Sequence, residues 1–308
     1  MTYPRSHLID PDGGTYHVCS RCVRRAFLFG KDTRTGKDFS HRREWIENRI
    51  LELSDIFTVS VYAYAVMSNH YHIVLRVESF DLSDEEVADR WLKLCPGRKV
   101  TKNTADVQMV RKATILNDGA MLEMLRARLG SLSWLMRFIN EPLARLANKE
   151  DHCKGRFWEG RFKSQALLDE ASVLACMVYV DLNPVRAKMA DTLEDSDFTS
   201  IQSRCDNDDK QAPLAALNQT ASKSVPFSKT TLGEYINLIK WTGVQQSHFR
   251  RGPQFNVSDC LKNNHTNMAH WFADHMPLPG TWQRAMGSGE ALGEYAVSIQ
   301  QCWIRRRS

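Results

Sequence analysis

The chain has 308 residues, of which 43% are hydrophobic and 25% charged, with a formal net charge of +5. This length can bury a sizeable core, and the composition is typical of a globular rather than a disordered protein. No stretch approaches the about 18 consecutive apolar residues that a membrane span needs, and the N-terminal segment lacks the apolar core of a signal peptide. We therefore expect a cytoplasmic protein with no membrane partner. The mildly basic charge permits a nucleic-acid partner without requiring one.

The first part of the chain predicts a strand, a helix and a hairpin. Residues Thr15–Arg21 alternate in polarity and predict the first strand. Ser40 is a candidate N-cap for a helix whose apolar residues recur at helical spacing. The segments Ile56–Val66 and His70–Val77 are rich in β-branched and aromatic residues and are separated by a short turn. They predict two antiparallel strands.

The second part begins with a charged, irregular stretch from about residue 80 to 130, which we interpret as an insertion. It is expected to hold a helix over Asp84–Leu94 and an exposed basic loop over Pro96–Thr114. Apolar residues at helical spacing then predict a helix over Ser131–Asn148, kinked by an internal proline. A strand around Phe162–Leu167 and a helix over Asp169–Leu182 follow.

The predicted fold class is α+β. The order β-α-β-β-α-β indicates a ferredoxin-like antiparallel sheet with helices on one face, followed by the helix that carries Tyr179. We place this domain at residues 13–190. Residues 191–308 are expected to form a mainly helical, partly loose C-terminal extension, because residues 202–230 are polar and rich in Ser, Asn, Asp and Lys. The sequence does not predict what this extension does.

His70 and His72 are the first candidate site residues. Side chains alternate between the two faces of a strand, so these two histidines share one face while Tyr71 points to the other. A single histidine on an apolar strand is more often structural than a metal ligand. A pair on one face is rarer and supplies half of a divalent-metal site.

Tyr179 and Asn183 lie about a hundred residues further on and are spaced i, i+4, so they share a helix face. Most tyrosines on apolar helices are core residues, and the register with Asn183 is what distinguishes Tyr179. The Asn183 oxygen suits a hard ion such as Mg²⁺ or Mn²⁺, between which the spacing does not discriminate. A phenol beside such an ion can attack a phosphodiester and form a phosphotyrosine link.

A basic-aromatic loop covers Lys154–Lys163 and is a candidate DNA-binding surface. Guanidinium and ammonium groups bind phosphates, and aromatic rings stack on unpaired bases. For the rings, a role as core anchors is an equal alternative. The predicted DNA-contacting residues, including a cluster near the first strand, are Arg21, Arg24, Arg25, Lys154, Arg156, Arg161 and Lys163.

Cys19 and Cys22 have the spacing of half a zinc site, but no second such pair follows. On a strand, residues three apart point to opposite sides and cannot share a metal ion. Buried, reduced thiols are therefore the better interpretation of this pair.

Four segments together resemble one known family, the REP-associated tyrosine transposases, which belong with the single-tyrosine insertion-sequence transposases to the HUH endonuclease superfamily. The resemblance spans roughly residues 13–190. The segments are CSRCVRRAFLFG (Cys19–Gly30), AYAVMSNHYHIVLRV (Ala63–Val77), GRFWEGRFKSQALLDE (Gly155–Glu170) and YVDLNPVRA (Tyr179–Ala187).

The resemblance implies that His70 and His72 are the metal-binding pair, that Tyr179 is the nucleophile and that Asn183 is a further metal ligand. It implies a metal-dependent enzyme that cuts and rejoins single-stranded or hairpin DNA of a repeated extragenic palindrome through a 5′-phosphotyrosine. Such a protein would be a bacterial monomer or homodimer, associated with the nucleoid when bound to DNA. Compact members end soon after the tyrosine helix, so the resemblance does not cover residues 191–308.

Three alternatives remain open. A domesticated protein can bind the repeats without cutting, although a pure binder needs neither the histidine pair nor Tyr179. A relaxase or replication-initiation nuclease shares the chemistry, but no helicase-like or nucleotide-binding segment is evident. An RNA-binding sheet can have the same element order, but it requires exposed aromatic residues where the histidines stand.

Overall fold

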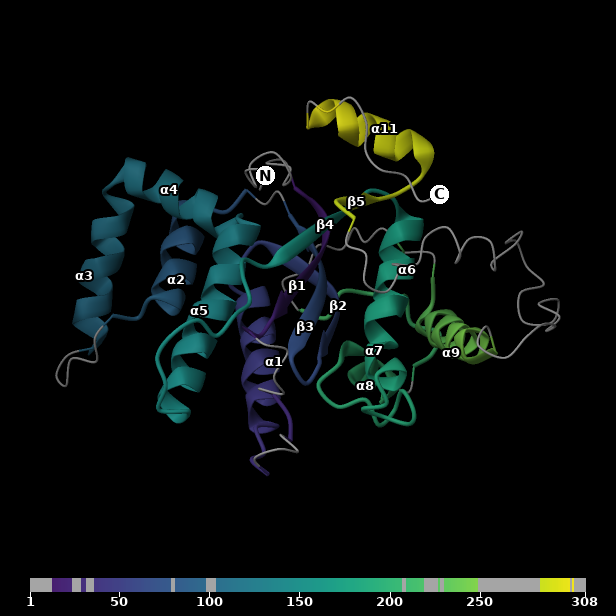
Figure 1. Ribbon diagram of the computed structural model, residues 1–308. Coiled ribbons are helices and arrows are strands. Elements are labelled where there is room, and N and C mark those ends of the chain that lie inside the picture. The colour runs from purple at the N-terminus through teal and green to yellow at the C-terminus, as the bar shows by residue number, and fades with distance from the viewer. Residues whose placement is uncertain are drawn as a thin grey trace.

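The computed structural model describes residues 13–23, 29–31, 36–78, 81–97, 104–206, 209–218, 227, 230–248, 283–299 and 301. Arg24 and Arg25, two of the predicted DNA contacts, lie outside these residues. Over the described ranges the protein combines one β-sheet with helices (Figure 1), which confirms the predicted α+β class.

The central sheet is built from strands that are distant in the sequence. The strands are β1 (Gly14–Arg21), β2 (Val59–Val66), β3 (His70–Val77), β4 (Lys163–Leu167) and β5 (Ala285–Met286). Within the described ranges they form one five-stranded sheet in the order β2-β3-β1-β4-β5. Neighbouring strands are antiparallel except β4 and β5, which are parallel. Because β5 comes from the C-terminal extension, its addition to the sheet edge was not predicted.

One face of the sheet packs against α1 (His41–Ser54) and α5 (Leu132–Glu150). The β3 side chains on this face include Tyr71 and Ile73, and both are buried with the apolar stripes of the two helices. The stripes form because apolar residues recur every three or four positions. Both helices agree with the prediction, including the internal Pro142 of α5.

The opposite face is covered by α6 (Glu170–Asp181), α8 (Ser200–Cys205) and α9 (Leu232–His248), so the prediction of helices on one face is wrong. Figure 1 shows the sheet between α1 and α5 on one side and α6 to α9 on the other. The physical reason is that every residue of β2 is buried. A sheet that is apolar on both faces requires a cover on both.

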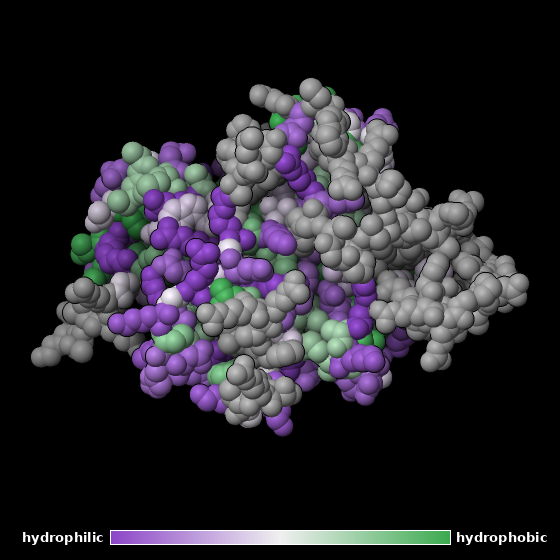
Figure 2. Space-filling view, viewed as in Figure 1, coloured by the Kyte–Doolittle hydropathy of each residue, from purple (hydrophilic) through white to green (hydrophobic). Residues whose placement is uncertain are grey.

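The insertion is a group of three helices, α2 (Asp84–Leu94), α3 (Thr104–Leu116) and α4 (Gly119–Leu129). The prediction of α2 is confirmed, and the prediction of a basic loop over Pro96–Thr114 is wrong from Thr104 onwards. Lys112 of α3 forms ion pairs with two carboxylates of α2, so the charges that suggested a loop belong to a helix–helix contact. Figure 2 shows apolar side chains gathered at this end of the molecule, where Val107, Met109, Val110 and Met124 are exposed.

Segments after residue 190 contribute to the core that covers α6. Leu214 and Phe227 are buried in the same apolar cluster as α6 and α9. After α6 comes a short helix, α7 (Asn183–Arg186), and near the C-terminus lies α11 (Gly289–Ser298). None of the described helices has both the length and the apolar character to cross a membrane.

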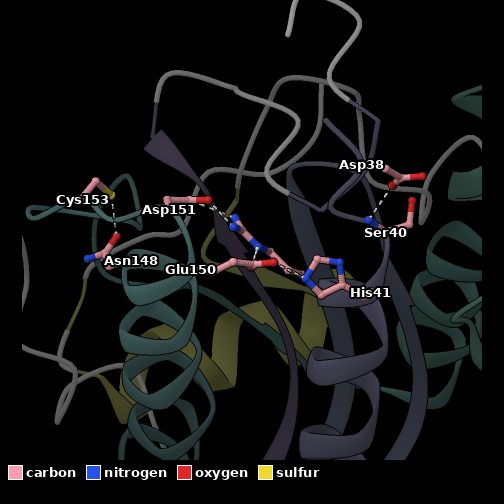
Figure 3. Close-up of polar contacts among 8 residues, drawn as sticks. Asp38, Ser40, His41, Asn148, Glu150, Asp151 and Cys153 are labelled. Carbon is pink, nitrogen blue, oxygen red and sulfur yellow. Dashed lines mark hydrogen bonds and ion pairs between the residues drawn. The ribbon is translucent and has the colours of Figure 1, made fainter. Parts of the chain in front are cut away.

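An ion-pair network joins the start of α1 to the end of α5, immediately before the basic loop. Arg42 is 1% exposed and binds Glu150 through Nε at 2.7 Å and both carboxylate oxygens of Asp151. His41 contacts the other Glu150 oxygen at 2.6 Å (Figure 3). Buried charges are stable only when they are paired in this way. The network therefore fixes the point from which the basic loop leaves the core.

Candidate active site

The histidine pair lies at the start of β3, as predicted, and its two members share one face of the sheet. Their ring centroids are 4.9 Å apart. His70 Nδ1 lies 2.6 Å from Asn69 Oδ1, an oxygen that can only accept a hydrogen bond. His70 therefore carries its proton on Nδ1, which leaves the lone pair on Nε2.

Tyr71, between the two histidines, points to the opposite face and anchors the strand. Its hydroxyl donates a hydrogen bond to Asn140 Oδ1 of α5 at 2.8 Å, and Asn140 Nδ2 donates to Ser20 Oγ at 3.0 Å. The Tyr71 ring also packs edge-on against the Trp158 ring, with the ring centroids 5.7 Å apart. These contacts fix the register of β3, which decides that both histidines face α6.

Tyr179 lies on α6 and faces the histidines across the sheet surface. Its ring centroid is 5.9 Å from that of His72. The helix begins at Asp169, whose carboxylate accepts a hydrogen bond from the Ser172 backbone at 2.8 Å. Such an N-cap stabilises a helix by about 1 kcal/mol. The imidazoles and the phenol, separated by about a hundred residues in the sequence, are thus brought together.

Asn183 belongs to the same site although α6 ends before it. The helix ends at Asp181, and Asn183 starts α7, with Pro184 next to it. The Asn183 side chain still lies close enough to the Tyr179 phenol to lower its pKa. Its Nδ2 atom is buried with no hydrogen-bond partner among the described residues. A buried, unpaired amide nitrogen is costly, which is typical of a group that has a partner in another state.

Burial controls the protonation of the site. It lowers the pKa of His70 to about 4, with a contribution from the positive charge of Arg21, and it lowers that of His72 well below its usual value. Both imidazoles are therefore neutral at pH 7, the form that binds a metal ion. Burial raises the pKa of Tyr179, while the Arg186 guanidinium, 5.2 Å from the ring centroid, lowers it.

His17 is a site residue that the sequence analysis missed. It lies in the middle of β1 on the same face, and its Nε2 atom is 2.9 Å from His72 Nδ1. Its ring is also 6.0 Å from that of Tyr179. The pairing of β1 with β3 could have indicated it, because Cys19 lies opposite His72 and His17 is two residues from Cys19 on the same strand, so it shares the face of the histidine pair.

The donor set suits a hard divalent cation only in part. Within the described part of the chain, no group of three or more His, Cys, Asp or Glu side chains is placed to hold a metal ion. His70 and His72, both neutral, would instead supply two nitrogens, and Asn183, which lies beside Tyr179, would supply one oxygen. Such a set fits a cation that takes its remaining ligands from a bound phosphate.

Of the predicted basic residues, Lys154, Arg156, Arg161 and Lys163 are exposed and Arg21 is half-buried. Arg21 is opposite His70 in the ladder, and Lys163 is opposite Cys19. The loop with Lys154, Arg156 and Arg161 is tied to the end of β1, where the Glu159 backbone N–H donates to the Arg21 carbonyl at 2.8 Å. Gly155, with φ of 124°, gives the loop a backbone conformation that other residues rarely adopt.

The aromatic residues of the loop are core anchors in this structure. Phe157 and Phe162 are 5% and 8% exposed, and Trp158 Nε1 donates a hydrogen bond to the Asn140 carbonyl at 2.9 Å. Of the two alternatives for these rings, the structure favours packing over base stacking.

Cys19 and Cys22 are both buried, and burial raises the pKa of Cys19 to about 12, as expected for structural thiols.

Comparisons with protein-family models and with curated proteins find no match. Among solved structures, the chain is similar to that of a REP-associated tyrosine transposase bound to a REP hairpin. The two share 13% sequence identity with a TM-score of 0.42, over 73% of this chain and 97% of that chain.

Proposed function

We propose that this protein is a single-tyrosine DNA transposase that cleaves and joins single-stranded or hairpin DNA, with a ferredoxin-like catalytic domain at residues 13–190. The observation that carries this assignment is the proximity of Tyr179 to the histidine pair, with ring centroids of Tyr179 and His72 5.9 Å apart. The resemblance of four sequence segments to REP-associated tyrosine transposases adds support.

In the proposed reaction, the Tyr179 oxygen attacks a backbone phosphorus in line with the leaving 3′ oxygen. A bond forms between the phenolic oxygen and phosphorus, and the bond from phosphorus to the 3′ oxygen breaks. The phenol proton passes to solvent, and the 3′ oxygen takes a proton from solvent, so the step is balanced. The products are a 5′-phosphotyrosine and a free 3′-hydroxyl, and the reverse reaction with another 3′ end joins strands without ATP.

His70 and His72, through their Nε2 atoms, and Asn183 would hold Mg²⁺ or Mn²⁺. When bound, the ion would neutralise charge on the scissile phosphate and favour the phenolate. Because burial raises the pKa of Tyr179, the phenol needs such a neighbouring charge, and Arg186 supplies part of it. Arg21 and Lys163 would bind phosphates next to the cleaved bond.

A second candidate is a repeat-DNA-binding protein that does not cut. The raised pKa of Tyr179 favours it, since a protonated phenol is a poor nucleophile. The basic surface would serve such a protein equally well. Oligomeric state, monomer or homodimer, and a location in the bacterial cytoplasm stay predictions.

A labelled single-stranded DNA hairpin, incubated with protein and Mn²⁺, tests the assignment on a denaturing gel. The wild type is expected to give a protein–DNA band that survives denaturation. The variant Tyr179→Phe should bind the hairpin without forming this band, because only the nucleophilic oxygen is lost. The matched control Tyr16→Phe removes a hydroxyl from the opposite face of the sheet and should retain the band.

A covalent band that persists in Tyr179→Phe would show that another group is the nucleophile. Hairpin binding by the wild type with no covalent band in any metal would favour the non-cleaving candidate. The double variant His70→Ala, His72→Ala should lose metal-dependent cleavage. Unchanged cleavage in this variant would contradict the metal site.

A further inference from the structure

His17 is almost completely enclosed and contacts one member of the histidine pair. His17 is 1% exposed and His72 is 4% exposed. The distance of 2.9 Å between His17 Nε2 and His72 Nδ1 is that of a hydrogen bond, and the two rings stack with centroids 5.0 Å apart. The contact links β1 to β3 directly behind the candidate active site.

This hydrogen bond decides which nitrogen of His72 faces the site with a lone pair. Both rings are almost fully buried, which favours the uncharged form of an imidazole. In a bond between two neutral imidazoles, one nitrogen donates and the other accepts. If His72 donates from Nδ1, its Nε2 keeps the lone pair. If His17 donates, the proton of His72 lies on Nε2.

His70 provides the pattern for choosing between these two cases. Its Nδ1 donates to the Asn69 oxygen, and its lone pair is therefore on Nε2. In His72, Nδ1 is engaged by His17, so Nε2 is the nitrogen left to bind a metal ion, and it can do so only with a lone pair. For His72 this requires a proton on Nδ1 and an acceptor opposite it, and His17 Nε2 is the atom in that place.

We propose that His17 is a positioning residue that accepts a hydrogen bond from His72 Nδ1 and thereby fixes His72 in the tautomer that ligates through Nε2. This role rests on the proposed function, because it serves the metal ion of that site. It follows the general rule that a metal-binding histidine donates its other N–H to a fixed partner, which orients the ring and increases its basicity.

Gln165 is the neighbour of His17 on the next strand. It lies directly opposite His17 in the ladder between β1 and β4 and is 4% exposed. The residue opposite His17 on β3 is Val74, two positions from His72, so the contact between His17 and His72 runs diagonally across the ladder. Gln165, His17 and His72 come from three neighbouring strands, β4, β1 and β3, and are in place before any ligand binds.

Two variants separate the hydrogen bond from the packing. His17→Leu keeps an apolar side chain of similar size but removes the acceptor. His17→Gln keeps a carbonyl oxygen that can accept from His72 Nδ1. Thermal unfolding followed by circular dichroism would confirm that each variant is folded.

The first readout is the tautomer of His72 in the protein without metal or DNA. Nitrogen-15 NMR of the imidazoles distinguishes a protonated ring nitrogen from one with a lone pair, and the His72 signals are assigned by their loss in His72→Gln. We expect a proton on Nδ1 in the wild type and in His17→Gln. In His17→Leu we expect the Nε2-protonated form to be populated.

The second readout is Mn²⁺ affinity, measured by electron paramagnetic resonance of the free ion. The loss of a hydrogen-bond partner behind a ligand typically weakens metal binding by about 10- to 100-fold. We expect a loss of this size in His17→Leu and recovery of most of it in His17→Gln. A purely structural role would lower the stability of both variants without this pattern of rescue.

A proton on Nε2 of His72 in the wild type would overturn the proposal, and this result does not depend on any variant. Unchanged Mn²⁺ affinity in folded His17→Leu would overturn it as well. The failure of the proposed function has a different signature. In that case the wild type forms no covalent DNA adduct, whatever the tautomer of His72.

Discussion

Three histidines of this protein are kept neutral by burial, which lowers the stability of the folded protein in acid. His17, His70 and His72 all face the same side of the sheet, and burial lowers the pKa of each. A buried imidazole cannot be protonated without losing hydration that the protein does not replace. The three rings are thus kept in the neutral form, which suits metal binding but makes the folded protein sensitive to acid.

We expect the free energy of unfolding to fall as the pH is lowered from 6.5 to 4. In this range the unfolded chain binds protons at His17 and His70, whose pKa values are about 4 in the folded protein and 6.5 otherwise. The contribution of these two histidines to the free energy of unfolding is therefore fully present above pH 6.5. It is lost as the pH falls towards 4, by a few kcal/mol in total, since each pKa unit corresponds to about 1.4 kcal/mol. Urea unfolding at a series of pH values measures it.

The variant His70→Gln isolates one histidine, because it removes a single titrating group. Its stability should decline less steeply than that of the wild type over the same range. Asp181 acts in the opposite sense, since burial raises its pKa to about 6 and its contribution is lost as the pH rises through that value. If the free energy of unfolding depended on pH equally in the wild type and in His70→Gln, His70 would have an ordinary pKa in the folded protein.

At the scale of elements, α6 is held on both sides. One side faces the sheet, and on the other the Asp181 carboxylate accepts hydrogen bonds from Ser200 Oγ and Tyr235 Oη, each at 2.5 Å. Ser200 also accepts a hydrogen bond from the Tyr64 backbone N–H of β2 at 3.0 Å. The helix that carries Tyr179 is therefore fixed to the sheet and to α9 by one buried carboxylate.

Tyr235→Phe should lower the free energy of unfolding by about 1 to 3 kcal/mol, because it leaves a buried carboxylate oxygen without its donor. Tyr62→Phe is the matched control. The Tyr62 hydroxyl is buried without a hydrogen-bond partner among the described residues, so its removal should be neutral or stabilising. Thermal or urea unfolding of the two variants provides the comparison, and equal losses would contradict the role of the Asp181 contact.

The elements that the sequence predicted well have strong local patterns. The bounds of β3 agree with the prediction, because its apolar run is flanked by turn residues, and α2 agrees because Ser83 and Glu86 form a capping box. The helix α3 was missed because it has few buried residues, and the charged residues between them hide the helical spacing. The strand β5 has two residues and forms only through pairing with β4, which no local pattern reveals.

The candidate site shows the same division. Strand alternation places His70 and His72 on one face, and helical spacing relates Tyr179 to Asn183, so these residues could be predicted. The contact of His17 with His72 depends on the register between β1 and β3, which tertiary packing sets. The position of α6 on the histidine face likewise depends on segments beyond residue 190, whose polar composition suggested a loose region.

On the scale of the whole molecule, the C-terminal segments cover the face of the sheet that α6 alone would leave partly open. Leu214, Phe227 and α9 share a core with α6, and Asp169 at the start of α6 accepts a hydrogen bond from the Ser288 backbone at 2.6 Å. The basic loop lies apart from these contacts, at the end of β1. Its cations are therefore exposed for a partner outside the chain.

Binding of single-stranded hairpin DNA should depend on salt through this loop. Each phosphate contact contributes about 0.7 to the slope of the logarithm of affinity against the logarithm of salt concentration. Replacement of Lys154, Arg156 and Arg161 by Gln should lower the slope by about 2 if all three bind phosphates. Fluorescence anisotropy of a labelled hairpin gives the affinity at each salt concentration. Titrations at about 50 to 200 mM KCl, a range over which such affinities change strongly, then give the slope.

The control variant removes the same charge elsewhere, by replacing Lys93, Lys112 and Lys240 with Gln on α2, α3 and α9. Because long-range attraction is screened within about 10 Å at moderate salt, this variant should lose little slope. Equal losses in the two triple variants would mean that the net charge, and not the loop beside His70 and Tyr179, attracts the DNA. A loss confined to the loop variant would place the nucleic acid next to the candidate nucleophile.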